Sequence, residues 1–290
     1  MLQDLSPRIL ALWAVPRSTS TAFAKAISGG EGVRVLHEPF TDCYYFGPQR
    51  RSSRYGDSPV VAGFDAAAAQ EFILSAAAEP DRIFVKDLAF QAYHYLQDDL
   101  LSKLTSTVLI RHPQRVMASL LRFKPDFTEE ELGFQALDAL TQRITHLQGR
   151  PPAIIEGEHF RAQPRQTLLH FCTTNGLPFS EAMLRWGSGS LRPWLPHESE
   201  SQRKWHATLE NSQTILPPSG SLPALDISGQ HQAMLERAME IYNRLTAPAL
   251  KHRLSRGVEE QPGAPLPPGL RTRSDLSVMH HQGQAQEPRR

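Results

Sequence analysis

An apolar run over Ile9–Val15 stops at Pro16, and a helical pattern starts at Thr21. Mostly apolar residues closed by a proline predict a buried strand, and the Ala, Phe and Lys content that follows predicts a helix. A strand that enters a helix through a tight turn directs backbone N–H groups and the positive end of the helix dipole to one point, where a phosphate or sulfate can bind. Arg17 adds a cation with forked donors, although an ordinary Ser- or Thr-capped helix is the alternative. Hydroxyl donors come from Ser18, Thr19, Ser20 and Thr21.

A second junction of the same kind follows the apolar strand pattern over Thr107–Ile110. Arg111 stands at the strand end, Pro113 suits the first position of a helix, and Ser119 lies two turns into that helix. The spacing lets Arg111 and Ser119 face one ligand. The alternative is a solvated arginine and a serine that bonds a backbone carbonyl one turn earlier.

Strand and helix patterns alternate along the chain, which predicts an α/β fold with a central parallel sheet flanked by helices. The expected strands are Ile9–Val15, Val33–Leu36, Arg82–Val85, Thr107–Ile110 and Ala153–Ile155. The expected helices are Ala66–Ala78, Gln114–Phe123, a stretch over Thr128–Leu147 that opens with a capping box, and a final helix over Gln230–Leu254.

The C-terminal third has a different composition from the rest of the chain. From Gly176 onward Pro, Ser and Trp predict long loops over the sheet, before the final helix. Beyond Arg256 the chain is rich in Pro and Gly with almost no aliphatic clusters, so it cannot bury enough surface to order itself. We therefore expect one domain over residues 1–255 and a disordered tail over 256–290.

Charge and cysteine content exclude several classes of protein. With 31 basic and 30 acidic side chains, no global field favours nucleic acid or an anionic membrane, so any anion site must be local. Two cysteines, Cys43 and Cys172, are too few for a disulfide framework or a Cys-rich zinc site. The apolar stretch near the N-terminus is too short to span a membrane and lacks the features of a signal peptide. A soluble, cytoplasmic protein is expected.

The two junctions together resemble the paired motifs of sulfotransferases that use 3′-phosphoadenosine 5′-phosphosulfate (PAPS). The letters PRSTST are similar to that family's 5′-phosphosulfate loop, PRSG(S/T)T, and VLIRHPQRVMAS is similar to its 3′-phosphate motif. Downstream, IIEGEHF and then GLPF resemble the family's acidic turn and later helix boundary, so the likeness covers roughly residues 8 to 186. The matching positions are Arg17, Ser18, Ser20, Thr21, Arg111 and Ser119.

This resemblance implies a P-loop NTPase-like sulfotransferase fold that binds PAPS as co-substrate and releases the bisphosphate PAP, without a metal. The implied reaction moves a sulfuryl group to a hydroxyl or amine of a small-molecule acceptor. The acceptor's identity and the oligomeric state cannot be read from the chain, because fold and donor site do not determine what lies opposite them.

One departure from the family pattern lies at Thr19, where the family has glycine. Threonine at positive φ is strained, so we expect this peptide to adopt negative φ, with hydroxyl donors replacing some of the backbone approach. The loop also lacks the lysine of a Walker motif, which argues against a nucleotide kinase or ATPase. The alternatives kept open are a kinase-like phosphotransferase and a non-catalytic binder of PAP-like nucleotides.

Candidate catalytic residues follow from the family's chemistry, which relies on positioning and cations. Arg17 is the candidate for the leaving 5′-phosphate, and Lys86 matches the family's strand-end lysine. Cytosolic members carry a histidine two residues after that lysine, which this chain lacks. The letters HEPF after the second strand instead resemble carbohydrate-type and several bacterial members of the family, which carry a glutamate that accepts the proton. This resemblance makes Glu38 the first choice of general base and His37 the second, and the alternative is a turn whose glutamate faces water. Asp87 and His94 are weaker candidates.

Aromatic residues supply the remaining hypotheses. Trp205 lies in a segment that faintly resembles the family's late cofactor-covering stretch, and its ring could stack on adenine. Tyr44 and Tyr45 follow Glu38 closely and are candidates for the acceptor pocket. We interpret Trp186, Trp194 and Trp205 as packing residues, and stacking on adenine is the alternative for Trp205.

Overall fold

A computed structural model describes residues 8–56, 58–79, 81–194 and 199–256. The chain divides into two units, Met1–Ala249 and Leu250–Arg290, and the sheet and the site discussed below lie in the first. The predicted disordered tail lies outside the described residues. Within the described ranges, no helix has both the length and the apolar content needed to cross a membrane.

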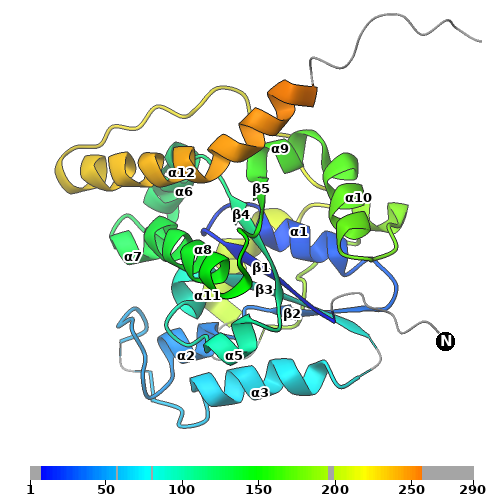
Figure 1. The fold of residues 1–290 in the computed structure, drawn as a ribbon. Helices are drawn as coiled ribbons and strands as arrows, with labels where there is room; N and C mark the ends of the chain where they lie inside the picture. Colours follow the sequence, from blue (N-terminus) through cyan, green and yellow to red (C-terminus); the bar gives the residue numbers. More distant parts are fainter. Residues whose placement is uncertain (1–7, 57, 80, 195–198, 257–290) are drawn as a thin grey trace, which may run out of the picture. The chain divides into compact units, whose positions relative to one another are not determined.

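Five parallel strands form the sheet (Figure 1). The strands are β1 Ile9–Ala14, β2 Val33–His37, β3 Arg82–Leu88, β4 Thr105–Ile110 and β5 Ala153–Glu156. Their order across the sheet is β2-β3-β1-β4-β5, so the chain leaves β1 toward one edge and β4 toward the other. Ligands of such sheets bind at the carboxyl ends of the strands, where the direction of winding reverses. The predicted strands and the parallel α/β architecture are confirmed.

β1 is central, and its apolar run is explained by burial on both faces, as parallel sheets require. Leu10, Leu12 and Ala14 pack in one apolar cluster, with the helices α1 (Ser20–Ile27) and α10 (Pro164–Thr174). A second cluster contains Ile9, Ala11, Trp13 and Val15, with residues of the helices α3 (Ala66–Ala76), α4 (Ala89–Ala92), α6 (Pro113–Phe123) and α8 (Phe134–Gln148). The Trp13 indole N–H donates to the Ser106 hydroxyl at 3.1 Å, so the largest core side chain is satisfied inside the sheet.

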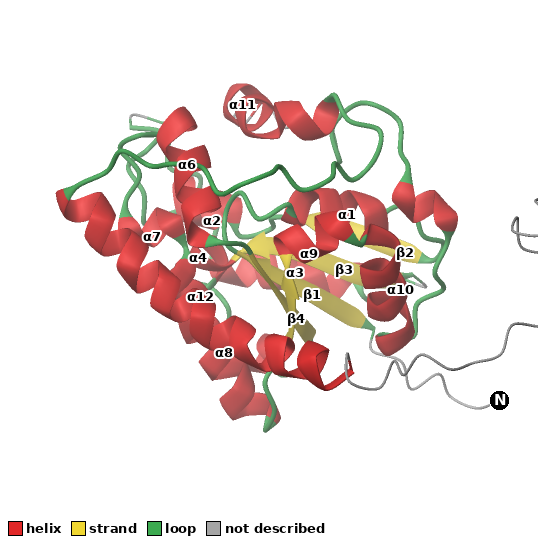
Figure 2. Cartoon of the chain, turned by 90° about the horizontal axis from the view of Figure 1, so that it is seen from above, coloured by secondary structure: helices red, strands yellow, loops and turns green. Residues whose placement is uncertain are grey.

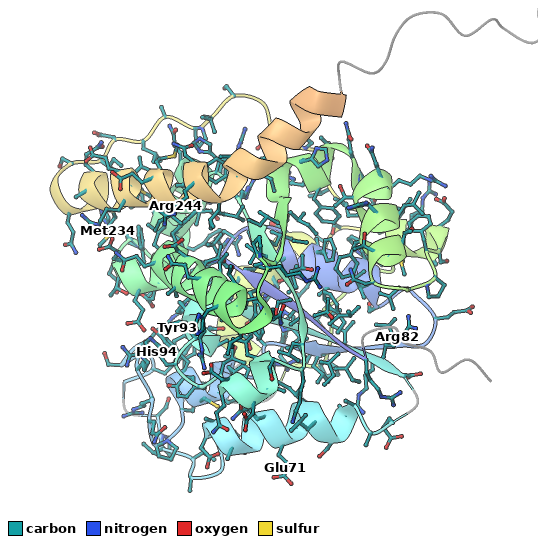
Figure 3. The ribbon with its side chains drawn as sticks, viewed as in Figure 1. Glu71, Arg82, Tyr93, His94, Met234 and Arg244 are labelled. Atoms are coloured by element: carbon teal, nitrogen blue, oxygen red, sulfur yellow. The ribbon has the colours of Figure 1, made fainter. Side chains whose placement is uncertain are left out.

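The helices connect these strands. Their bounds are α1 Ser20–Ile27, α2 Thr41–Tyr45, α3 Ala66–Ala76, α4 Ala89–Ala92, α5 Asp98–Leu101, α6 Pro113–Phe123, α7 Glu129–Leu132, α8 Phe134–Gln148, α9 Gly157–Ala162, α10 Pro164–Thr174, the 3₁₀ helix Glu181–Leu184, α11 Ser199–Glu210 and α12 Gly229–Arg256. On α12, Arg244 forms an ion pair with Asp138 of α8 at 2.7 Å, and Met234 is buried (Figure 3).

The prediction of one helix over Thr128–Leu147 is wrong, because the chain breaks into α7 and α8 at Gly133. Gly133 has φ 84°, and a Cβ there would lie 2.8 Å from Pro16 Cδ. The turn therefore lets this segment pass directly against the loop after β1. The capping box itself is confirmed, since Thr128 and Glu131 cap each other's backbone N–H groups.

The prediction of continuous loops between Gly176 and the final helix is also wrong, because α11 lies within that stretch. Lys204 donates to the Phe123 carbonyl at the end of α6, at 2.7 Å. The Trp194 indole donates to Glu210 at 2.9 Å. Figure 2 shows α11 on the side of the molecule opposite α8. Contacts distant in sequence position this helix, and composition alone does not reveal them.

Candidate anion-binding and acceptor site

The loop after β1 has a strained backbone. Arg17 has φ 58° and Thr19 has φ 72°, so the expectation that Thr19 takes negative φ is wrong. Left-handed conformations cost side-chain-bearing residues roughly 1–2 kcal/mol each, and such strain is concentrated at functional sites. In the described chain, Glu38 at φ 53° is the remaining non-glycine residue with positive φ. All three lie at the carboxyl ends of the strands.

Local contacts explain how this strain is held. The Ser18 hydroxyl donates to the Val15 carbonyl at 2.7 Å, and the Thr19 hydroxyl donates to the Ser18 carbonyl. Gly157, which begins α9, lies so close that a Cβ there would be 2.7 Å from the Ser18 carbonyl oxygen. These two hydroxyls therefore brace the loop. No side chain caps α1, so its first N–H groups are left for a ligand.

Arg17 connects this loop to two other elements. Its Nε donates to the Ser119 hydroxyl at 2.9 Å, and its NH1 donates to the Trp205 carbonyl at 2.7 Å. Burial, with Arg111 nearby, lowers the pKa of Arg17 to about 10, so it remains charged at neutral pH. Arg17 and Ser119, predicted from separate motifs, thus meet directly.

Three arginines surround Glu158 beside the loop after β4. Arg111 donates to Glu158 Oε1 at 2.7 Å through Nε, and to the Arg17 carbonyl at 2.9 Å through NH1. Arg161 NH1 and Arg115 Nε lie 3.4 and 3.7 Å from the Glu158 carboxylate. The cations outnumber the acid, so the cluster can bind a further anion. The acidic turn in the IIEGEHF stretch was the only sequence signal for Glu158.

The same arginines hold the segment that follows α11. Arg161 Nε donates to the Leu216 carbonyl at 3.0 Å, and Arg115 NH1 donates to the Ser219 hydroxyl at 2.9 Å. This segment therefore covers the arginine cluster. Neither Arg115 nor Arg161 was singled out from the sequence, because only the fold brings α6 and α9 together.

Glu38 and Lys86 form a buried ion pair at the ends of β2 and β3. Burial alone raises the pKa of Glu38, but the charge of Lys86 and the nearby histidines lower this pKa overall, well below its usual range. The Thr41 hydroxyl lies 3.3 Å from Glu38 Oε2. Glu38 is thus ionised at neutral pH, and it is a weak base while Lys86 stays paired with it.

Two histidines lie beside this pair, and only one of them faces the cavity. His37 is buried with its Nε2 3.7 Å from Glu38 Oε1, and burial lowers its pKa well below the usual value. His206, on α11, lines the cavity, and burial lowers its pKa to about 4, so its imidazole is neutral at pH 7. The two rings are 5.6 Å apart. Sequence reasoning missed His206 as a candidate base, because its only signal was its place next to Trp205.

These elements enclose a cavity of about 730 Å³. Of the residues predicted from the sequence, it is lined by Arg17, Ser18, Thr19, Ser20, Thr21, Glu38, Tyr45, Lys86, Arg111, Ser119 and Trp205. The Trp205 ring contacts the guanidinium groups of Arg17 and Arg54, with ring-centroid distances of 5.5 and 4.9 Å. Its stacking on adenine stays a prediction.

The other predicted residues lie away from the described cavity lining. His37 and Tyr44 are buried behind it, and Asp87 is a buried carboxyl that accepts the Phe40 N–H at 2.9 Å. His94, labelled in Figure 3, lies 3.4 Å from Glu130 on a part-exposed surface. Trp186 and Trp194 donate their indole N–H groups to Ser212 and Glu210, as packing residues do.

The described residues also bear on metal binding. In the ranges given above, no three His, Cys, Asp or Glu side chains are grouped so that they could hold a metal ion. The cations of the cavity lining are arginines and two lysines, Lys86 and Lys124.

The profile of the sulfotransferase domain family matches residues 7–249, and the chain belongs to this family. Two curated proteins of Arabidopsis thaliana are similar to it. Branched-chain-amino-acid aminotransferase-like protein 2 is 24% identical over 247 residues, which are 85% of this chain and 43% of that protein. Branched-chain-amino-acid aminotransferase-like protein 1 is 24% identical over 277 residues, which are 90% of this chain and 45% of that protein. The chain thus spans less than half the length of these relatives.

Two solved structures are also similar to the chain. The sulfotransferase domain from the curacin biosynthetic pathway has 16% identity and a TM-score of 0.48, over 83% of this chain and 98% of that one. The sulfotransferase domain from the Synechococcus PCC 7002 olefin synthase has 17% identity and a TM-score of 0.44, over 83% of this chain and 96% of that one.

Proposed function

We propose that this chain transfers a sulfuryl group from PAPS to a hydroxyl or amine of a small-molecule acceptor. The observation that carries the proposal is the meeting of the two anion loops, through the Arg17–Ser119 bond and the Arg111 bond to the Arg17 carbonyl. A donor with phosphates at both ends of one ribose needs two adjacent anion sites. A kinase-like reading is less well supported, because the loop after β1 has no lysine.

The described residues fit such a donor. The uncapped start of α1 and the positive-φ loop offer N–H groups for the 5′-phosphosulfate. Arg111 and Ser119 are assigned to the 3′-phosphate. The Glu158 carboxylate, which accepts a hydrogen bond from Arg111, is an anion of the chain itself beside this position. Arg17, between them, is assigned to the leaving 5′-phosphate.

The reaction breaks the bond between sulfur and the donor and forms a bond between sulfur and the acceptor. The acceptor oxygen or nitrogen bonds to sulfur, the bond from sulfur to the 5′-phosphate oxygen breaks, and PAP leaves with that electron pair. Lys86 and Arg17 stabilise the charge on the leaving oxygen. The acceptor proton passes to a base in the cavity.

Glu38 is the base we favour, because it lines the cavity and its carboxylate is ionised. Its basicity increases when Lys86 shifts its charge toward the donor. His206 is the competing base, because its neutral imidazole lines the same cavity.

The direct test is turnover of labelled PAPS with a panel of hydroxylated and amino metabolites, measured as labelled product and as PAP. We expect Glu38→Gln to lose about 100- to 10,000-fold in kcat while it still binds PAP. The exposed Glu31→Gln is the matched control. Absence of labelled product with every acceptor, together with no PAP binding, would sink the proposal. Retained turnover in Glu38→Gln and loss in His206→Gln would move the base to His206.

A further inference from the structure

Arg54 lies in the segment after α2 and lines the cavity, yet neither the donor loops nor the catalytic pair uses it. Its guanidinium carbon is 4.9 Å from the ring centroid of Trp205, 5.4 Å from that of Tyr55 and 5.8 Å from that of Tyr45. Aromatic rings attract a guanidinium group without using its in-plane N–H donors. The rings therefore hold the group and leave its donors available.

Glu131, which lines the same cavity, and Asp126 both pair with another cation. Lys124 lies 3.0 Å from Glu131 and 3.4 Å from Asp126. Over the described ranges, no carboxylate forms an ion pair with Arg54, whose hydrogen bond is a long one of 3.4 Å from NH1 to the Tyr45 hydroxyl. A half-buried guanidinium group with spare donors is suited to bind a carboxylate in a forked geometry.

Arg54 is also close to the reacting groups. The Trp205 ring that it contacts is 5.5 Å from the guanidinium carbon of Arg17. From the other side, the Thr41 hydroxyl lies 3.3 Å from Glu38 and 3.0 Å from Gln91 Oε1, and Gln91 bonds the Tyr45 hydroxyl. A polar wall thus runs from the base candidate to Arg54. Both ends of this wall, Glu38 and Arg54, line the same cavity.

We propose that Arg54 binds a carboxylate of the acceptor, so that the preferred acceptors are small hydroxy acids. The hydroxyl group lies at Glu38 and Lys86, and the carboxylate lies at Arg54 beside Trp205. This assignment rests on the proposed function, since it names the acceptor class for the same site. Arg54 is a specificity-determining residue and takes no part in the bond changes.

The test measures binding to the PAP-loaded protein by calorimetry, with 4-hydroxybutanoate, 6-hydroxyhexanoate and 8-hydroxyoctanoate each compared with its neutral amide. A charged hydrogen bond contributes about 1.5–3 kcal/mol, so we expect at least one acid to bind about 10- to 100-fold more tightly than its amide. Arg54→Gln should abolish this preference and leave PAP affinity unchanged. Arg50→Gln is the matched control, because Arg50 bonds the Ser58 carbonyl at 3.0 Å and is outside the cavity lining.

The outcomes separate the two proposals. Failure of PAP itself to bind overturns the proposed function. If PAP binds, the Arg54 assignment is overturned when no acid binds, when acids and amides bind equally, or when Arg54→Gln retains the preference. A fall in PAP affinity in Arg54→Gln also overturns it, because Arg54 then contacts the donor.

Discussion

The loop after β1 and the loop after β4 each end a parallel strand with an arginine, yet they present different groups to an anion. The first has positive φ at Arg17 and Thr19 and leads into an uncapped helix, so its backbone N–H groups are available. The second has ordinary dihedral angles, and the ring of His112 caps α6 while Pro113 has no N–H. Its anion capacity comes from side chains. In the proposed function, the strained backbone lies where the reacting group must be held most closely.

The two loops are also covered differently. Arg17 bonds the Trp205 carbonyl on α11, which brings His206 over the first loop. Arg115 and Arg161 bond the segment around residues 216–220, which covers the second. The first cover is held by an arginine of the loop beneath it, and the second by arginines of α6 and α9.

Among variants of the two loops and their covers, the largest effect is expected at the charge of the first loop. Arg17→Ala removes a cation beside the leaving group, so kcat should fall by about 100- to 1,000-fold. Steady-state kinetics with PAPS measures this, with the exposed Arg34→Ala as control. An Arg17→Ala enzyme within a factor of a few of the unchanged protein would mean that the first loop does not stabilise the transferred group.

A smaller effect is expected from the cover over the first loop. Burial keeps His206 neutral in the folded protein, with a pKa of about 4, whereas the unfolded chain binds a proton at this histidine near pH 6.5. As the pH falls from about 6.5 to 4, the unfolded state therefore binds more protons than the folded state, and the free energy of unfolding decreases. Between pH 7 and pH 5, the free energy of unfolding should therefore decrease in both proteins, and the decrease should be about 2 kcal/mol smaller in His206→Gln than in the unchanged protein. Urea unfolding at both pH values tests this. Equal losses in the two proteins would show that α11 does not bury His206 in solution.

The smallest effect concerns the strain itself. Thr19→Gly removes a Cβ from a left-handed position but adds chain entropy to the unfolded state, so the net gain in stability should be about 1 kcal/mol or less. Thr19→Ala keeps the Cβ and should give no such gain. Urea unfolding compares the two variants. A loss of stability in Thr19→Gly would indicate that the contacts of the threonine side chain stabilise the loop by more than the left-handed backbone costs.

The features that could be predicted from the sequence are those that depend on local residue patterns. The run over β1 and the proline after it were sufficient to locate the first loop, and the second junction located Arg111 and Ser119. The φ of Thr19 was not predictable, because the close approach of Gly157 and the Ser18 bond to Val15 impose it from elsewhere. The break at Gly133 likewise depends on its contact with Pro16.

The covering elements were the least predictable part of the site. The position of α11 depends on Arg17 and on the Lys204 bond to Phe123, which join residues far apart in the chain. His206, Arg54 and Arg161 therefore reach the cavity through tertiary contacts. Their residue types alone gave no indication of a role.

The measurement that tests the central claim most directly is calorimetric titration with PAP, 5′-AMP and ATP-magnesium, repeated with Arg111→Ala. Two meeting anion loops predict that PAP binds about 10- to 100-fold more tightly than 5′-AMP, and that Arg111→Ala removes this difference while 5′-AMP affinity stays unchanged. Equal affinity for PAP and 5′-AMP, or tighter binding of ATP-magnesium, would contradict the assignment of the second loop to a 3′-phosphate.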